Sequence, residues 1–147
     1  MFKVSNLRGK SMNVNRRKLS REHMMKVIFQ IEARNDFQGT DREIYFEDNG
    51  KKLEKEYCEK MYENFLTNHD CIDENIKKYS TEWDITRIAK IDLSILRLAI
   101  AEILFFPDID VAVTINEAVN LAKLYGAENS PAFVNAVLGS ISKERRE

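Results

Sequence analysis

The sequence is poor in the residues that interrupt helices and in those that build disulfide or metal sites. Its 147 residues include 5 glycines, 2 prolines, 2 cysteines and 2 histidines. So little glycine and proline argues against a many-stranded sandwich and favours helices. Cys58 and Cys71 have no CxxC spacing and no histidine-rich surroundings, so they do not predict a zinc site. We expect two ordinary thiols in a reducing compartment, the cytoplasm.

Long apolar runs and the common catalytic motifs are also missing. The longest apolar run is far shorter than the ~18 residues of a membrane-spanning helix. The first ten residues lack the apolar segment of a signal peptide. No GxxxxGK[ST], GxGxxG, HExxH or GxSxG motif occurs. We therefore expect a protein that binds other macromolecules away from membranes, with no catalytic residue, no cofactor and no metal.

What the sequence does contain is a segregated charge. Residues 1–26 carry eight basic side chains and one acidic side chain, a net charge of +7, and the remaining residues carry −8. A basic segment attracts phosphates, and an acidic body suits a neutral or basic protein partner. Residues 1–15 are polar and aperiodic, so we expect a basic extension that is disordered until a partner binds. Residues 16–147 are expected to form a single domain.

Apolar residues recur at helical spacing along most of the chain. They predict a first helix over residues 20–34, capped by Ser20, and a loop or short helix over residues 35–50. Trp83 is expected in the core. Further helices are predicted over residues 52–68, 70–79, 84–91, 92–106 and 114–125, and from about residue 130 onward. The sequence therefore predicts an all-α bundle of about seven helices with antiparallel neighbours.

Several residues have the chemistry and spacing of helix ends. Asp92 fits the N-cap or first turn of the most apolar helix. Thr114 and Glu117 have the spacing of a capping box, and Gly126 fits a left-handed residue that closes the helix before it. Pro131 suits the first turn of the last helix.

Two segments are not fully explained by secondary structure. Residues 16–22 place four cations, Arg16, Arg17, Lys18 and Arg21, at the expected start of a helix, where phosphates bind well. Residues 124–135 join two helices and combine base-stacking rings with polar groups that read base edges, namely Tyr125, Asn129, Ser130, Phe133 and Asn135. Composition leaves a structural interpretation of the second segment equally open, in which it is a helix corner with Phe133 in the core.

Four stretches together resemble the NusB family of bacterial transcription antitermination factors. They are Arg16-Arg-Lys-Leu-Ser-Arg-Glu22; residues 83–87 followed by Asp92 and Ile95-Leu-Arg-Leu-Ala99; Thr114-Ile-Asn-Glu-Ala118; and Leu121-Ala-Lys-Leu-Tyr-Gly126 with Phe133-Val-Asn135. Each stretch alone is a weak signal, but their order and spacing are specific. The likeness runs from about Arg16 to Ile141, nearly the whole chain.

The resemblance implies an all-α fold of two small helical subdomains. It implies binding of the single-stranded boxA element of ribosomal RNA leader transcripts, together with NusE, a small-subunit ribosomal protein, in the complex that carries RNA polymerase past terminators. It places Asp92 and Phe29 on the partner-facing surface. Asp92 as a mere helix cap remains an equally open interpretation. Some family members are homodimers that hide the RNA surface.

The chain departs from the family pattern at three positions. Phe29 stands where a tyrosine is frequent, Asn129 where an aspartate is common, and Ala136 where a glycine usually follows Val-Asn. Losing a negative charge at Asn129 favours RNA binding. Two alternatives remain: a helical adaptor that binds only protein, and a relative of the NusB-like domain of ribosomal RNA cytosine methyltransferases. Those chains continue into an α/β domain, whereas this sequence ends at Glu147.

Overall fold

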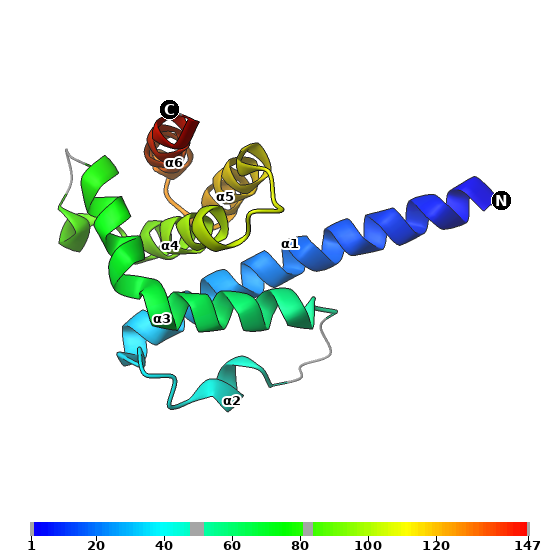
Figure 1. The fold of residues 1–147 in the computed structure, drawn as a ribbon, viewed down its shortest axis with the longest axis horizontal. Helices are drawn as coiled ribbons and strands as arrows, with labels where there is room; N and C mark the ends of the chain where they lie inside the picture. Colours follow the sequence, from blue (N-terminus) through cyan, green and yellow to red (C-terminus); the bar gives the residue numbers. More distant parts are fainter. Residues whose placement is uncertain (1, 48–51, 81–83, 147) are drawn as a thin grey trace.

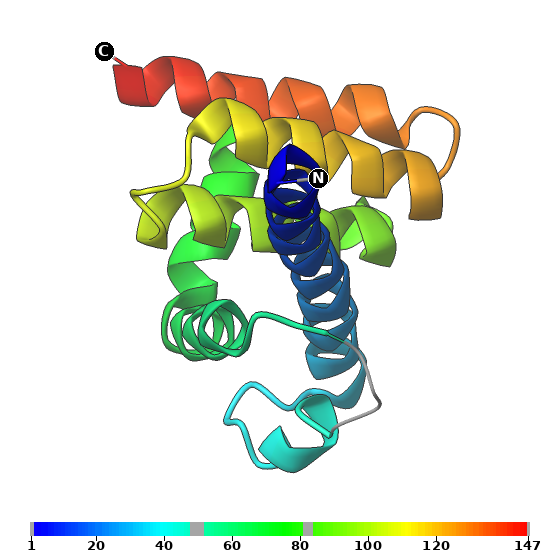
Figure 2. The same ribbon diagram turned by 90° about the vertical axis from the view of Figure 1, so that its right-hand side faces the viewer.

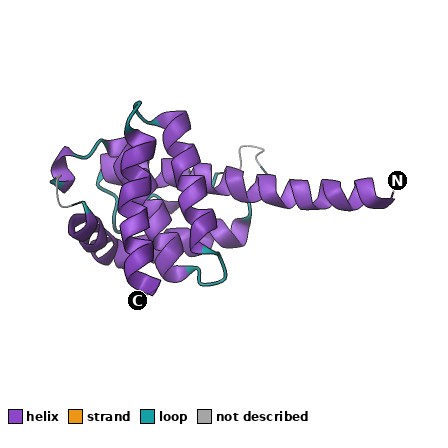
Figure 3. Ribbon diagram, turned by 90° about the horizontal axis from the view of Figure 1, so that it is seen from above, coloured by secondary structure: helices purple, strands orange, loops and turns teal. Residues whose placement is uncertain are grey.

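A computed structural model describes residues 2–47, 52–80 and 84–146. Over these residues the chain has helices and loops and no strand (Figures 1 and 3). The elements are α1 (Phe2–Arg34), α2 (Arg42–Tyr45), α3 (Lys55–Tyr79), the short 3₁₀-helix η1 (Ile85–Arg87), α4 (Lys90–Phe105), α5 (Val111–Tyr125) and α6 (Ser130–Arg146). The prediction of an all-α fold is confirmed, with six α-helices in the described residues where about seven were expected.

The helices form two groups that share one core. In Figure 1, α1 runs beside the first half of α3 with α2 outside them, and α5 and α6 lie on the opposite side of α4. Helix α4 lies between the groups, and every residue from 92 to 103 is buried. A helix that is apolar around most of its circumference is central by necessity. The sequence pattern therefore identified α4 correctly as the middle of the molecule.

The apolar stripes read from the sequence are the residues that fill the core. Met24, Val27, Ile28 and Ile31 of α1 are all buried, as are Tyr57, Met61 and Phe65 of α3. The stripe predicted for the last helix is buried as well: Val134, Val137, Leu138 and Ile141. The expected core position of Trp83 lies outside the described residues.

The predicted start of the first helix is wrong. Helix α1 begins at Phe2, and Ser20 lies inside it as a buried residue instead of capping it. The Ser20 hydroxyl donates to the Arg16 carbonyl (2.7 Å) and accepts from the Glu54 backbone N–H (2.8 Å). In Figure 1 the N-terminal part of α1 projects away from the other helices. Because an unpacked helical segment is marginal in water, disorder of residues 1–15 in the free protein stays a prediction.

Three other predicted helix boundaries are corrected. The helices expected over 52–68 and 70–79 are one helix, α3, kinked at Asn68 (φ −120°, ψ 16°). The helix expected over 84–91 is only the short η1, because the Asp84 side chain accepts from the Thr86 N–H and closes a tight turn. Helix α5 is capped by Asp110, whose carboxylate accepts from the Ala112 N–H (3.0 Å).

The predicted capping box at Thr114 is therefore wrong, and Thr114 has a different role in the core. Its hydroxyl donates to Glu102 (2.7 Å), a carboxylate only 1% exposed in the middle of α4. Glu102 also accepts from the Tyr57 hydroxyl (2.6 Å) and from Nε and Nη2 of Arg21 (2.9–3.2 Å). One carboxylate thus joins α1, α3, α4 and α5.

The buried ion pair of this cluster changes the titration of its members. Burial, together with the neighbouring Glu102 charge, raises the pKa of Tyr57 well above its ordinary value. Burial would lower the pKa of Arg21, but the hydrogen bond and the charge of Glu102 outweigh it and raise that pKa. Tyr57 therefore remains a neutral donor and Arg21 a cation.

We predict that Glu102→Gln destabilises the protein by about 3–5 kcal/mol, because it leaves the buried Arg21 cation without its counter-charge. Urea denaturation followed by circular dichroism measures this loss. Glu144→Gln is the matched control, because Glu144 pairs with Lys78 on the surface, and an exposed pair contributes less than about 1 kcal/mol. Equal losses in the two variants would contradict the central role of Glu102.

Candidate nucleic-acid interface

The four predicted phosphate-binding cations do not project together. Arg16 and Lys18 are exposed, whereas Arg17 is half-buried and Arg21 is only 5% exposed in its pair with Glu102. Arg17 donates to Glu54 through Nε (2.9 Å) and Nη2 (2.6 Å), and its guanidinium lies 4.6 Å from the centroid of the Tyr57 ring. Arg17 thus turns toward α3, because successive helix residues point in directions about 100° apart.

The fold does bring the basic segment of α1 beside the end of α5. The ammonium group of Lys18 lies 2.9 Å from Glu117 of α5. One turn further along α1, Glu22 accepts a hydrogen bond from the hydroxyl of Tyr125. The Tyr125 ring also lies 5.3 Å from the ammonium nitrogen of Lys26. Figure 2 shows α1 nearly end-on, crossing in front of α4 and α5.

The turn between α5 and α6 is held by Ser130. Its hydroxyl accepts from the Ala127 N–H (2.9 Å) and donates to Oδ2 of Asp92 (3.0 Å), and Ser130 is only 2% exposed. The left-handed backbone predicted for Gly126 is wrong, because its φ is −90°. Gly126 instead provides space: a Cβ there would come within 2.5 Å of the Ser130 Cβ.

The other predicted RNA-binding residues at the start of α6 do not all lie on the same side. Asn129 is exposed, and Phe133 packs partly against the core. Asn135 is exposed two residues after Phe133, a spacing that puts the two side chains on opposite faces of a helix. The structure therefore groups Asn129 with Phe133 and sets Asn135 apart.

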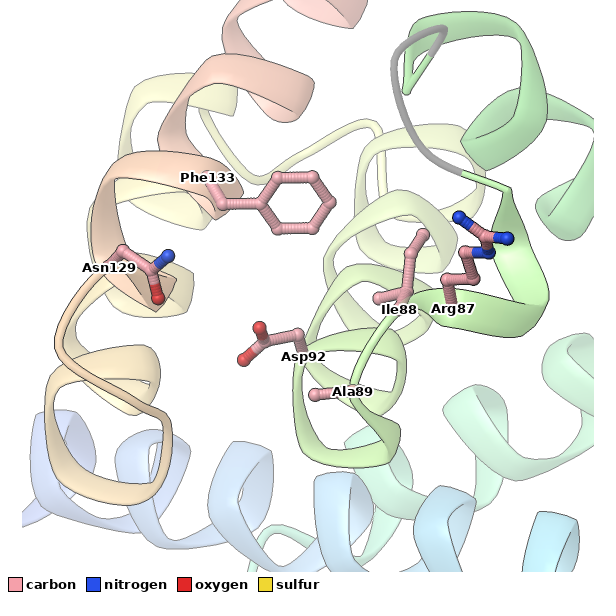
Figure 4. Close-up of a pocket in the computed structure, with 6 residues that line it drawn as sticks. All are labelled: Arg87, Ile88, Ala89, Asp92, Asn129 and Phe133. Carbon is pink, nitrogen blue, oxygen red and sulfur yellow. The ribbon is translucent and has the colours of Figure 1, made fainter.

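Asn129 and Phe133 line a pocket of about 270 Å³ that also includes Asp92. The other lining residues are Arg87 at the end of η1, and Ile88 and Ala89 in the link from η1 to α4 (Figure 4). Asp92 does not cap α4: the N-cap position is Ala89, and the Asp92 side chain makes no capping bond. Its carboxylate instead reaches the α5–α6 turn through Ser130.

Phe29 lies on the same side of α1 as the contacts to α5. Lys18, Glu22, Lys26 and Phe29 follow one another at spacings of four, four and three residues, which places them along one stripe of a helix. Phe29 is partly exposed. It continues this stripe beyond the point where Tyr125 meets Glu22.

The described residues contain neither a metal-binding cluster nor a membrane-spanning helix. Within them, no three histidine, cysteine or acidic side chains gather where they would hold a metal ion. Nor does any helix in those ranges have the length and hydropathy to cross a membrane.

Comparison with known proteins decides the family. The model of the NusB family matches residues 18–143. The transcription antitermination protein NusB of Alkaliphilus oremlandii (strain OhILAs) is 46% identical over 125 residues, which are 84% of this chain and 90% of that protein. The protein of the same name from Clostridium acetobutylicum is 42% identical over 132 residues, covering 89% and 98% of the two chains. This chain belongs to the NusB family.

Solved structures agree with this membership. T. maritima NusB superposes with a TM-score of 0.76 at 37% identity, over 86% of this chain and 90% of that one. A chain of the structure described as "Crystal Structure of a Plectonemic RNA Supercoil" has a TM-score of 0.77 at 27% identity, over 87% and 94% of the two chains. The NusB fold, inferred first from motif order, is thus confirmed.

Several residues of this NusB-family site were missed by sequence reasoning. Glu22, Lys26 and Glu117 form the contact between α1 and α5, and Arg87 lines the pocket. The spacing of residues 18, 22 and 26 indicated a shared face. Nothing in the sequence indicated that α5 would lie against that face.

We predict that Gly126→Ala destabilises the protein by about 1–3 kcal/mol, the usual cost of overpacking. The new methyl group would meet Ser130 and, at 2.8 Å, the Ala122 carbonyl oxygen. Thermal denaturation measures the effect. Gly139→Ala is the control: nothing lies within 4 Å of its added Cβ, so we expect it to stabilise α6 by about 0.5–1 kcal/mol. A neutral Gly126→Ala would show that the corner tolerates the methyl group.

Proposed function

We propose that this chain is a transcription antitermination factor that binds the boxA element of ribosomal RNA leader transcripts together with NusE. Membership of the NusB family supports the proposal, because the curated relatives compared above carry that name. In this proposal it acts without catalysis, in the cytoplasm, as part of the complex that helps RNA polymerase read through terminators.

The observation that carries RNA binding is the meeting of α1 with the end of α5. Lys18 and Tyr125 are more than 100 residues apart in sequence, yet both connect α1 to α5. Lys18 of α1 contacts Glu117 of α5, and Tyr125 of α5 contacts Glu22 of α1. Cations beside an exposed aromatic ring are the usual chemistry of a single-strand site. We assign phosphate contacts to Arg16 and Lys18 and base stacking to Tyr125.

The buried members of the predicted set take positioning roles in this proposal. Arg21 fixes α1 on α4 through Glu102, and Ser130 fixes the α5–α6 turn on Asp92. Arg17, paired with Glu54, holds the basic end of α1 against α3. Asn129 and Phe133 read a base at the pocket, and Asn135 contacts the strand outside it.

The acidic partners of the exposed cations do not prevent RNA binding. Lys18 pairs with Glu117 at the surface, where its side chain is 46% exposed. Such pairs contribute at most about 1 kcal/mol. A phosphate can therefore replace the carboxylate at low cost, since exchanging one anion for another keeps the cation paired.

We predict that Arg16→Ala and Lys18→Ala each reduce the salt dependence of RNA affinity. The slope of log affinity against log salt concentration should become less negative by about 0.7, the single-strand value for one phosphate contact. Affinity for a boxA RNA is measured by fluorescence anisotropy across a salt series. Lys77→Ala is the control, because Lys77 is an exposed cation near the far end of α3, paired with Glu74.

A slope near zero in the unmodified protein would overturn RNA binding and favour an adaptor that binds only protein. If RNA still binds and neither substitution changes the salt dependence of its affinity, the phosphate contacts do not lie at the basic end of α1.

We further propose that NusE binds at Phe29 and the neighbouring start of α4. Glu32, one turn after Phe29, pairs with Lys90 in the first turn of α4 (3.1 Å), so these two segments lie side by side. The net charge of −8 on residues 27–147 attracts a basic ribosomal protein.

We predict that Phe29→Ala lowers NusE affinity by about 2 kcal/mol, roughly thirty-fold, as expected when an aromatic anchor is removed from an interface. Calorimetric titration measures the affinity, and thermal denaturation of the same variant shows whether the fold is intact. Ile44→Ala in α2 removes an apolar side chain that is also exposed, and we expect no change in affinity from it. Equal affinities for the two variants would exclude Phe29 from the interface.

A further inference from the structure

A second buried cation, Arg97 of α4, lies where α4 meets α3 and the last turn of α1. Its side chain is only 5% exposed. Its Nε and Nη2 each donate to one carboxylate oxygen of Asp73, both at 2.9 Å. Two parallel hydrogen bonds of this kind fix the plane of a guanidinium group. Asp73 belongs to the part of α3 that follows the kink at Asn68, so the pair holds that part of α3 on α4.

The remaining nitrogen of Arg97 stops short of a hydrogen bond. Nη1 lies 3.5 Å from Oε2 of Glu32 in the last turn of α1, and within the described residues it makes no hydrogen bond. The other oxygen of Glu32, Oε1, accepts from the ammonium group of Lys90 at 3.1 Å. Burial would raise the pKa of Glu32, but the two cations outweigh it and lower that pKa. One charged carboxylate is therefore shared between a buried cation and an exposed one.

Asp73 controls how that carboxylate is shared. Without the Asp73 charge, Arg97 is free to turn toward Glu32 and form the stronger bidentate pair with it. Glu32 would then be drawn away from Lys90, whose side chain is 57% exposed. Lys90 is the first residue of α4, and Glu32 follows Phe29 by one turn of α1. The released ammonium group would lie beside the surface proposed for NusE and repel a basic partner.

We propose that Asp73 and Arg97 are positioning residues for the NusE surface. By holding Arg97 away from Glu32, Asp73 keeps Glu32 on Lys90, so the start of α4 stays close to α1 and carries no unpaired cation. This inference rests on the NusE site proposed above, and it gives a role to residues outside Phe29 and the start of α4. It adds a charge requirement to that site: Lys90 has to be neutralised before a basic protein binds.

Calorimetric titration of the full chain with NusE, at one fixed salt concentration, tests this charge requirement. We expect Asp73→Asn to lower NusE affinity about five-fold, the effect of one exposed charge. Glu32→Gln releases Lys90 directly and should lower the affinity by at least as much. Glu74→Gln is the matched control, because it removes the acid next to Asp73 in sequence. Glu74 pairs only with Lys77 at the surface, so we expect unchanged affinity.

A second substitution separates positioning from a general loss of structure. Lys90→Gln removes the cation itself, so Asp73→Asn should no longer lower NusE affinity when the two are combined. A variant weakened only by partial unfolding would not be rescued in this way. Affinity for boxA RNA, measured on the same proteins, should be unchanged by Asp73→Asn because the RNA surface is positioned by Glu102. Melting temperatures set a titration temperature at which every variant is folded.

The outcomes separate this inference from the proposed function. If the unmodified protein does not bind NusE, the proposed partner fails and this inference fails with it. If it binds NusE and Asp73→Asn binds equally well, Asp73 has no positioning role and the proposed partner stands. If the loss persists in the Lys90→Gln background, or if NusE and RNA affinities fall together, Asp73 only stabilises the fold and the inference is wrong.

Discussion

The arrangement of the whole molecule depends on the buried carboxylate of Glu102. It accepts hydrogen bonds from Arg21 of α1, Tyr57 of α3 and Thr114 of α5. This one carboxylate of α4 therefore links four helices. A charge buried this deeply is tolerable only when it is fully paired. Helices packed by apolar contacts alone can slide and repack, but this constellation allows one crossing of α1 over α4 and α5. The position of every surface residue on α1 follows from that crossing.

That crossing creates the proposed RNA surface. Because Arg21 is held by Glu102, the neighbouring residues Lys18 and Glu22, one turn apart on the outer side of α1, face α5. There they meet Glu117 and Tyr125. Of the four cations in residues 16–21, the most buried, Arg21, is thus the one that positions the others. Loss of the buried pair would therefore disturb the proposed RNA contacts of residues that never touch it.

A second polar contact joins the proposed RNA corner to the region proposed for the protein partner. Ser130 links the α5–α6 turn to Asp92 in the first turn of α4, and Gly126 leaves the space in which Ser130 sits. Both segments line one pocket, so whatever binds there contacts both. The start of α4 and the turn that carries Asn129 are therefore joined by a side-chain hydrogen bond.

The sequence by itself determined the helical class, the central position of α4 and the family, because apolar periodicity and motif order are local properties of the chain. It also identified the two segments of the proposed RNA site. The tertiary structure alone decided which side chains of those segments are exposed. Arg16 and Arg21 look alike in sequence, yet one is on the surface and the other is buried against a glutamate 81 residues away. Such long-range pairing depends on how helices cross, and no local pattern encodes that crossing.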